Sequence, residues 1–215
     1  PVGHYYLPEP DKWHMSDQGA DFIYTGRNPV TFMLPNGLRE IVDADVWENL
    51  ADRQNKHPFF NWVQYVEASA KDPLLNFVHL DARDLNESLK VLVRNDPTAV
   101  LVVSTQNAHA MAAIRRMFFE LVEEGIDVPV VIRREYEINS EDAFMIAAAT
   151  DAGGLYIDGF GDGIMLGITA PVGGSVPAEW IDRCNRTAFG ILQATRNRMS
   201  KTEYISCPSC GRTLF

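Results

Sequence analysis

Two cysteines near the end of the chain carry the sharpest chemical signal in the sequence. Cys207 and Cys210 form a CxxC pair, with Pro208 and Gly211 shaping a tight turn around the thiols. Zinc sites, iron–sulfur clusters and redox dithiols all use this spacing, because it points two thiolates at one centre. Two thiolates do not complete a metal site. The pair alone therefore predicts an incomplete metal or cluster site, of which a zinc knuckle is one form, with a bare thiol pair as the alternative.

Cys184 is the remaining cysteine of the 215-residue chain. It follows Asp182 and Arg183 in an amphipathic stretch, and free cysteines are among the most buried residue types. We therefore expect a partly buried cysteine within a helix, and not a metal ligand. Three cysteines, an odd number, argue against a disulfide scaffold and favour a reducing, cytoplasmic compartment.

A glycine-rich stretch, DGFGDGIMLG at 158–167, could bring backbone amides close to an anion. We predict a strand at 154–160, which runs into the stretch that contains Gly159, Gly161 and Gly163. The spacing differs from that of a dinucleotide-binding fingerprint. We favour the simpler interpretation, a tight strand-to-helix turn at the rim of a sheet.

Polar side chains follow the predicted strand TAVLVVST. Ser104, Thr105, Asn107 and His109 lie at its carboxyl end, which is where α/β proteins bind ligands. The less specific explanation is that Ser104 or Thr105 caps the next helix, and this is the one we expect.

Two arginines and a histidine occupy neighbouring predicted strands. Arg133 and Arg134 come near the end of VPVVIRREY, where one could hold a phosphate, although ion pairing with nearby acids explains them equally well. His79 alternates with Val78 and Leu80 in FVHLDA. We expect a hydrogen-bonded sheet histidine there and not a metal ligand.

The first forty or so residues of the chain show no regular alternation of strands and helices. We predict short strands at 21–26 and 30–34, and two helices over 46–70 divided by Pro58, because proline clashes with a preceding helical turn. The aromatic stretch 57–65 is assigned to the core or to an interface.

From residue 75 onward strands and helices alternate. The predicted strands are 75–82, 98–105, 128–136, 154–160 and 202–207, and the predicted helices are 107–127, 140–154 and 179–199. Gly125 is expected to end the first of these helices and Ser140 to cap the second. Continuous apolar strands alternating with helices indicate a helix-covered parallel sheet. We predict an α/β, TIM-barrel-like (β/α) domain with parallel strands. The pattern does not decide whether the barrel is closed, or whether it is incomplete or irregular.

Composition narrows the classes of partner. The formal net charge of −10 and a pI near 4.9 argue against nucleic acid and anionic membrane surfaces. The sequence contains no run of 18 or more apolar residues, so a membrane-spanning helix is not expected. The start, PVGHYYLPEP, lacks the features of a signal peptide and is interpreted as a cut end.

The last third of the chain resembles the 4-hydroxy-3-methylbut-2-enyl diphosphate synthase family. The resemblance covers about 143–215 and is carried by DGFGDGIMLG, ILQATRNRM and KTEYISCPSCGRTLF. A looser one, through FIYTGRNPVTFMLPNGLRE, is to the extra middle domain of the large, three-domain form. Together, the two resemblances imply an inserted, barrel-like middle domain at 1–200 and the truncated start of a carboxy-terminal 4Fe–4S domain at 201–215.

The resemblance also implies a cofactor and partners. Cys207 and Cys210 match two ligands of a 4Fe–4S cluster, whose third cysteine and glutamate would lie downstream, so this fragment is not expected to hold the cluster. The family reductively opens 2-C-methylerythritol 2,4-cyclodiphosphate in isoprenoid biosynthesis, with ferredoxin or flavodoxin as electron donor. The implied role of this piece is structural. It would place the cluster domain against the catalytic barrel of the same chain, carry no catalytic residue and be inactive alone.

Two other functions compete with this one. The CxxC pair could belong to a zinc-knuckle interaction module without enzymatic activity. Alternatively, the chain could be a stand-alone barrel enzyme that binds a phosphate at the rim formed by Gly159–Gly163.

Overall fold

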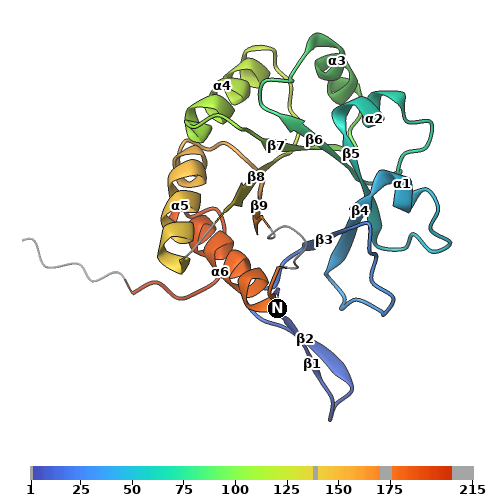
Figure 1. The fold of residues 1–215 in the computed structure, drawn as a ribbon, viewed down its shortest axis with the longest axis vertical. Coiled ribbons are helices and arrows are strands. Elements are labelled where there is room, and N and C mark those ends of the chain that lie inside the picture. Colours follow the sequence, from blue (N-terminus) through green and yellow to red (C-terminus); the bar gives the residue numbers. More distant parts are fainter. Residues whose placement is uncertain (1, 138–139, 170–175, 205–215) are drawn as a thin grey trace, which may run out of the picture.

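The computed structural model describes residues 2–137, 140–169 and 176–204. These residues contain a two-stranded antiparallel sheet and a seven-stranded parallel sheet. The parallel strands follow one another in chain order, and the sheet curls so that helices surround its convex side (Figure 1). The predicted α/β fold with an incomplete, TIM-barrel-like sheet is confirmed.

Strand and helix alternate along most of the chain. The parallel strands are β3 (Phe22–Gly26), β4 (Arg39–Asp43), β5 (Lys56–Asn61), β6 (Asn76–Asp81), β7 (Ala99–Ser104), β8 (Val130–Tyr136) and β9 (Gly163–Ile168). The helices are α1 (Ala44–Trp47), α2 (Trp62–Glu67), α3 (Glu87–Asn95), α4 (Ala110–Glu123), α5 (Glu141–Ile157) and α6 (Ala178–Ala194). Each helix follows one strand, beginning with α1 after β4. None of the described helices is long and apolar enough to cross a membrane.

Successive side chains of the central strands pack on opposite faces of the sheet. Leu80, Val103 and Ile132 belong to the main core between the convex face and the helices. Phe77 and Val102 belong to a second apolar cluster on the other face. The central strands are thus buried on both sides, as their continuous apolar runs predict.

The sheet is not closed by hydrogen bonds between its two edge strands. Within the described residues, no register joins β3 to β9. Side chains near α6 hold the two ends together instead: Asn185 Nδ2 donates to the Gln18 carbonyl at 3.0 Å, and Arg198 pairs with Asp21 next to β3. In the described part of the chain, side-chain contacts and not an eighth strand therefore link the two edges of the incomplete barrel.

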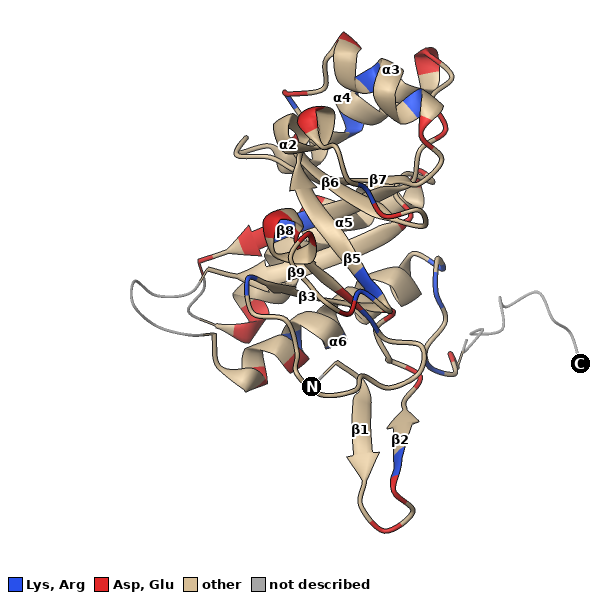
Figure 2. Cartoon of the chain, turned by 90° about the vertical axis from the view of Figure 1, so that its right-hand side faces the viewer, with Lys and Arg blue, Asp and Glu red and all other residues tan. Residues whose placement is uncertain are grey.

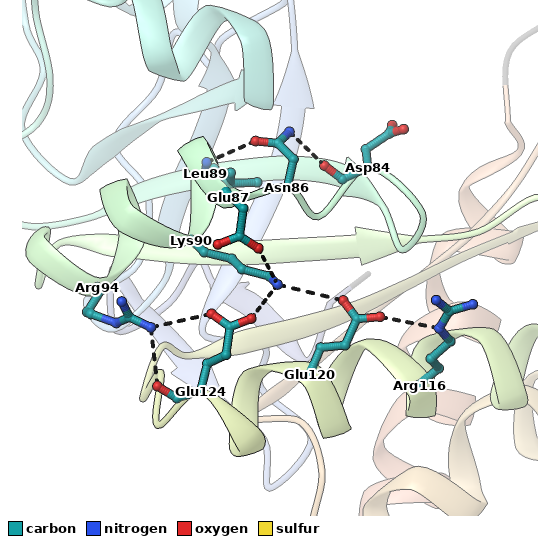
Figure 3. A network of polar contacts seen from close by, with 9 residues as sticks. All are labelled: Asp84, Asn86, Glu87, Leu89, Lys90, Arg94, Arg116, Glu120 and Glu124. Atoms are coloured by element: carbon teal, nitrogen blue, oxygen red, sulfur yellow. Dashed lines mark hydrogen bonds and ion pairs between the residues drawn. The ribbon is translucent and has the colours of Figure 1, made fainter.

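A buried lysine links α3 to α4 (Figure 3). Lys90 Nζ lies 2.5 Å from Glu124, 3.0 Å from Glu87 and 4.0 Å from Glu120. The side chain of Lys90 is only 8% exposed, so its stem packs between the helices while its charge is balanced by acids from both. No helix was predicted between the strands at 75–82 and 98–105, yet Glu87–Asn95 forms α3, and these ion pairs join it to α4.

Two helix ends follow the predicted chemistry. The hydroxyl of Ser140 accepts a hydrogen bond from the amide of Ala143 and caps α5. Gly125, at a φ of +64°, ends α4 with paired hydrogen bonds from Gly125 to Val122 and from Ile126 to Leu121.

The predictions for the first third of the sheet were partly wrong. Residues 22–26 form a strand, but 30–34 do not. Pro58 lies inside strand β5, and not between two helices. Proline is tolerated there because the ladder to β6 begins only at Phe59, so its missing N–H interrupts little. The stretch 57–65 contributes Phe59 and Phe60 to the core, as predicted.

The strand predicted at 154–160 was also wrong, because α5 continues to Ile157. Phe144, Ala148, Ala152 and Leu155 are fully buried at helical spacing, and this packing overrides the glycines at 153–154. A Cβ on Gly154 would lie 2.6 Å from Met111 Sδ, so glycine here permits close contact between α5 and α4. The strand predicted at 202–207 falls largely outside the described residues, and 202–204 are not in a strand.

Candidate functional site

A cavity opens at the carboxyl ends of β6, β7 and β8. Its volume is about 380 Å³, and its lining is mostly polar. The residues that matter here are His79, Ser104, Thr105, Arg133, Arg134 and Asp151. These residues come from separate parts of the chain, and the parallel sheet brings them together at one edge, as its geometry predicts.

His79 and Ser104 lie on adjacent strands and contact each other. His79 Nε2 is 2.9 Å from the hydroxyl of Ser104, so the expected hydrogen-bonded sheet histidine is confirmed. Burial lowers the pKa of His79, and the Arg133 guanidinium lowers it further. Among the described residues no side chain hydrogen-bonds Nδ1 of His79. The pair therefore lacks the orienting carboxylate of a catalytic triad.

Arg134 is held in place by three parts of the fold. Its Nε donates to Asp151 of α5 at 2.9 Å, and its Nη1 donates to the Thr105 carbonyl at 2.6 Å. The hydroxyl of Tyr136 donates to the same carboxylate at 3.0 Å. Arg134 thus joins the loop after β7, strand β8 and α5, and its charge is compensated within the protein.

Arg133 points to the concave side of the sheet. Its Nη2 lies 2.5 Å from Glu135, and its guanidinium sits over the ring of Phe59, 5.6 Å from the centroid. Both arginines form ion pairs, Arg133 with Glu135 and Arg134 with Asp151, which was one of the two explanations considered for them. Their charges are already matched by Glu135 and Asp151, which weakens the case for a phosphate site at this edge.

The loop after β7 has a different arrangement from the one predicted. The prediction that Ser104 or Thr105 caps α4 was wrong, because His109 occupies the cap position and makes no side-chain capping bond. Thr105 Oγ1 accepts from the amide of Asn107 at 3.1 Å, and Asn107 Oδ1 accepts from the amide of His109 at 2.8 Å. The polar residues here hydrogen-bond within their own loop.

The glycine-rich turn lies at the opposite edge of the sheet. Gly159 ends α5, with hydrogen bonds from Gly159 to Tyr156 and from Phe160 to Leu155. Gly161, at a φ of +92°, then leads to the amino end of β9. The predicted strand-to-helix turn is thus wrong: the turn runs from helix α5 to strand β9 and lies at the edge of the sheet away from the cavity.

The cysteines divide into two groups. Cys184 is buried in α6, and burial raises the pKa of its thiol to about 11, which disfavours the thiolate that a metal requires. This agrees with the prediction of a buried helix cysteine. Cys207 and Cys210 lie outside the described residues. Within the described part of the chain, no group of three or more His, Cys, Asp or Glu side chains could hold a metal ion.

Sequence reasoning missed a buried carboxylate on the other side of the sheet. Glu40 of β4 is fully buried, with Lys56 Nζ at 2.5 Å, the Thr25 hydroxyl at 2.6 Å and the Val30 amide at 2.7 Å. The available signal was an acid directly before the apolar pair Ile41 and Val42 in the short strand REIVD. This group is structural, because the protein satisfies it completely.

Comparison with known proteins gives a consistent result. The chain is 39% identical over 198 residues to a protein of Parabacteroides distasonis named 4-hydroxy-3-methylbut-2-en-1-yl diphosphate synthase (flavodoxin). A protein of Phocaeicola vulgatus with the same name is 36% identical over 195 residues. Both alignments cover 91% of this chain but only 30% of the relative, so the chain spans less than a third of their length.

A plant protein matches a shorter part. The chloroplastic 4-hydroxy-3-methylbut-2-en-1-yl diphosphate synthase (ferredoxin) of Arabidopsis thaliana is 40% identical over 133 residues, which is 60% of this chain and 17% of that protein. No protein-family model and no solved structure matches the chain.

Proposed function

We propose, on the premise that this chain belongs as one segment to the 4-hydroxy-3-methylbut-2-en-1-yl diphosphate synthase family, that residues 1–200 form a rigid spacer domain of such an enzyme. One observation carries the proposal most directly. The arginines at the carboxyl edge of the sheet, where a barrel enzyme would bind its substrate, are paired with Glu135 and Asp151. A domain whose candidate site is neutralised in this way is suited to placing other domains.

The activity proposed for the full-length protein is that of the family. By its resemblance to that family, the full-length protein would reductively open 2-C-methylerythritol 2,4-cyclodiphosphate. The names of the relatives indicate flavodoxin or ferredoxin as the electron donor. Residues 201–215 would begin the cluster domain, with Cys207 and Cys210 as two ligands of a 4Fe–4S cluster and the other ligands outside this chain. That cluster would supply single electrons. Its thiolate ligands need a reducing compartment, so the cytoplasm stays the predicted location.

The fold supports a rigid connection to whatever follows it. Gln193, in the last turn of α6, accepts hydrogen bonds through its side chain from the amides of Ser200 and Lys201, at 2.9 and 2.8 Å, and donates to the Lys201 carbonyl at 2.8 Å. Arg198 pairs with Asp21 beside β3. The chain therefore leaves the domain from a segment tied to both α6 and the first parallel strand.

Insertions of increasing length test the spacer role in the full-length protein. Gly-Ser insertions of two, four and eight residues directly after Ser200 should lower kcat stepwise, by about 100-fold for the longest, because small displacements of a reacting group are costly. Visible absorbance of the cluster should not change. The matched control is the same insertion after Gly37, in an exposed turn where a Cβ would meet no other atom within 4 Å. Full activity with eight residues inserted after Ser200 would contradict the proposal.

The competing hypothesis, a stand-alone barrel enzyme that binds phosphate, predicts a different result. If the cavity binds phosphate esters, inorganic phosphate should raise the melting temperature of the 215-residue chain in a saturable way, and Arg133→Ala should abolish this. The spacer proposal expects no saturable shift.

A further inference from the structure

The β1–β2 hairpin, formed by β1 (His4–Leu7) and β2 (Lys12–Met15), projects from the body of the protein (Figures 1 and 2). Tyr5 lies directly opposite His14, and Tyr6 lies directly opposite Trp13. Because neighbouring residues of a strand point to opposite faces, one aromatic pair lies on each face of the hairpin. Tyr5 and Tyr6 are nevertheless 48% and 45% exposed.

The base of the hairpin is fixed to the body by tight backbone contacts. Gly3 has a φ of +75°, and a Cβ there would lie 2.0 Å from the Gln18 carbonyl oxygen. The amide of Ser16 donates to the Gly3 carbonyl at 2.9 Å, and His4 Nε2 lies 2.9 Å from the Ala20 carbonyl oxygen. The hairpin therefore leaves the domain in a defined direction.

The projecting part has little stabilisation of its own. Neither of the two hydrophobic clusters of the described residues includes a side chain from β1 or β2. An isolated two-stranded hairpin is at best marginally stable in water. Its two faces carry tyrosine, tryptophan and methionine, whereas its charges lie mainly near the turn (Figure 2). Tyrosine, tryptophan and methionine are enriched where proteins contact one another.

We propose that the β1–β2 hairpin docks against another domain of the same full-length polypeptide, outside residues 1–215, and fixes the orientation of this domain to it. The length of the relatives favours this occupant over a second copy or a separate protein. The chain matches 30% of the Parabacteroides distasonis protein, which leaves about 70% of that protein as further polypeptide. The inference rests on the proposed spacer function, because a spacer sets geometry only through fixed contacts with what it positions.

Site-specific photo-crosslinking in the full-length protein tests this. Tyr6→p-benzoylphenylalanine keeps an aromatic ring at the hairpin, and irradiation should join it to peptides outside residues 1–215 without raising the molecular mass. The matched control carries the same group at Val91, which is 53% exposed. Val91 belongs to α3, a helix that lies far from the hairpin (Figure 1), and the control should give no such product. Adding Trp13→Ser to the Tyr6 variant should lower the crosslink yield at least fivefold.

Two outcomes would overturn the proposal. A product of doubled mass would identify a second copy as the occupant, and absence of crosslinks from Tyr6 in a protein that turns over normally would show an unoccupied hairpin. Hydrogen exchange gives an independent readout: the amides of β1 and β2 should exchange at least tenfold more slowly in the full-length protein than in the 215-residue chain. Equal exchange rates contradict docking but leave the insertion experiment after Ser200, and with it the spacer function, untouched.

Discussion

The two halves of the parallel sheet are covered in different ways. Along β6 to β9, the helices α3 to α6 cover the convex face, and their buried residues are mostly apolar. Along β3 to β5, residues 27–38 form a loop, and α1 and α2 have only four and six residues. Buried polar side chains hold the chain in place there, chiefly Glu40, which binds both Thr25 and Val30.

This difference separates two ways of stabilising one sheet. Apolar burial is spread over many contacts and does not depend on direction. A buried carboxylate concentrates its contribution in a few directional bonds, and leaving their partners unpaired is costly. The β3–β5 half should therefore depend on single polar groups, whereas the β6–β9 half should depend on side-chain volume.

The largest effect is expected at Glu40. Glu40→Ala leaves the Lys56 ammonium and two further donors without their partner and should lower the free energy of unfolding by about 3–5 kcal/mol, measured by urea denaturation. Glu40→Gln, which retains an oxygen acceptor but not the charge, should fall between Glu40→Ala and the unaltered protein. If Glu40→Ala costs less than Glu40→Gln, the polar-anchor description of this half is wrong.

An intermediate effect is expected in the helical half. Ile114 of α4 is fully buried in the main core, and Ile114→Ala should lower the free energy of unfolding by about 3 kcal/mol through lost burial and the cavity that remains. Val122 of the same helix is 64% exposed and provides the control. Val122→Ala should change stability by no more than about 0.5 kcal/mol.

The smallest effect is expected at His57, where the protein should gain stability. Within the described residues, both ring nitrogens of His57 are buried without a hydrogen-bond partner, and Asp72 Oδ1, at 3.6 Å from Nδ1, is too distant to supply one. His57→Met should raise the free energy of unfolding by about 1 kcal/mol in urea denaturation at pH 7, because it removes an unsatisfied polar group.

The same variant should alter the response to acid. Burial lowers the pKa of His57, assisted by the Arg39 guanidinium and opposed by Asp72. The unfolded state therefore binds a proton first, so stability is complete above the ordinary pKa of about 6.5 and declines as pH falls below it. The decline from pH 7 to pH 5 should be smaller in His57→Met, with the part due to His79 remaining. An unchanged decline would exclude His57 as a contributor.

Correct and wrong sequence predictions occur in both halves: the strand at 22–26 was found in one, whereas the strand at 154–160 and the cap at Ser104 or Thr105 were wrong in the other. In the β6–β9 half, the apolar runs, the cap at Ser140 and the terminating Gly125 were identified correctly, because each acts over a few neighbouring residues. In the β3–β5 half, Pro58 was taken as a helix break, although a short apolar run is compatible with either strand or helix. Only the pairing of β5 with β4 and β6 decides that it is a strand.

The candidate site was predictable in position but not in chemistry. Parallel strands bring their carboxyl ends to one edge, so Ser104, Arg133 and Arg134 could be placed together from their positions in the sequence. Their partners could not, because Asp151 lies 17 residues from Arg134 along the chain and reaches it only through the packing of α5. The glycine-rich turn was predicted at the wrong edge of the sheet, because the packing of α5 extends this helix through Gly153 and Gly154.

By itself, the sequence determined what depends on local pattern and residue type: the alternation of strands and helices, the α/β class, the buried Cys184 and the CxxC pair that suggests a metal or cluster site. The tertiary structure alone decided which charges neutralise one another, where α5 ends, and that side chains link β3 to the β9 end of the sheet where the described residues form no strand pairing. Those outcomes depend on contacts between residues far apart in the chain, where the free energy of packing exceeds any local preference.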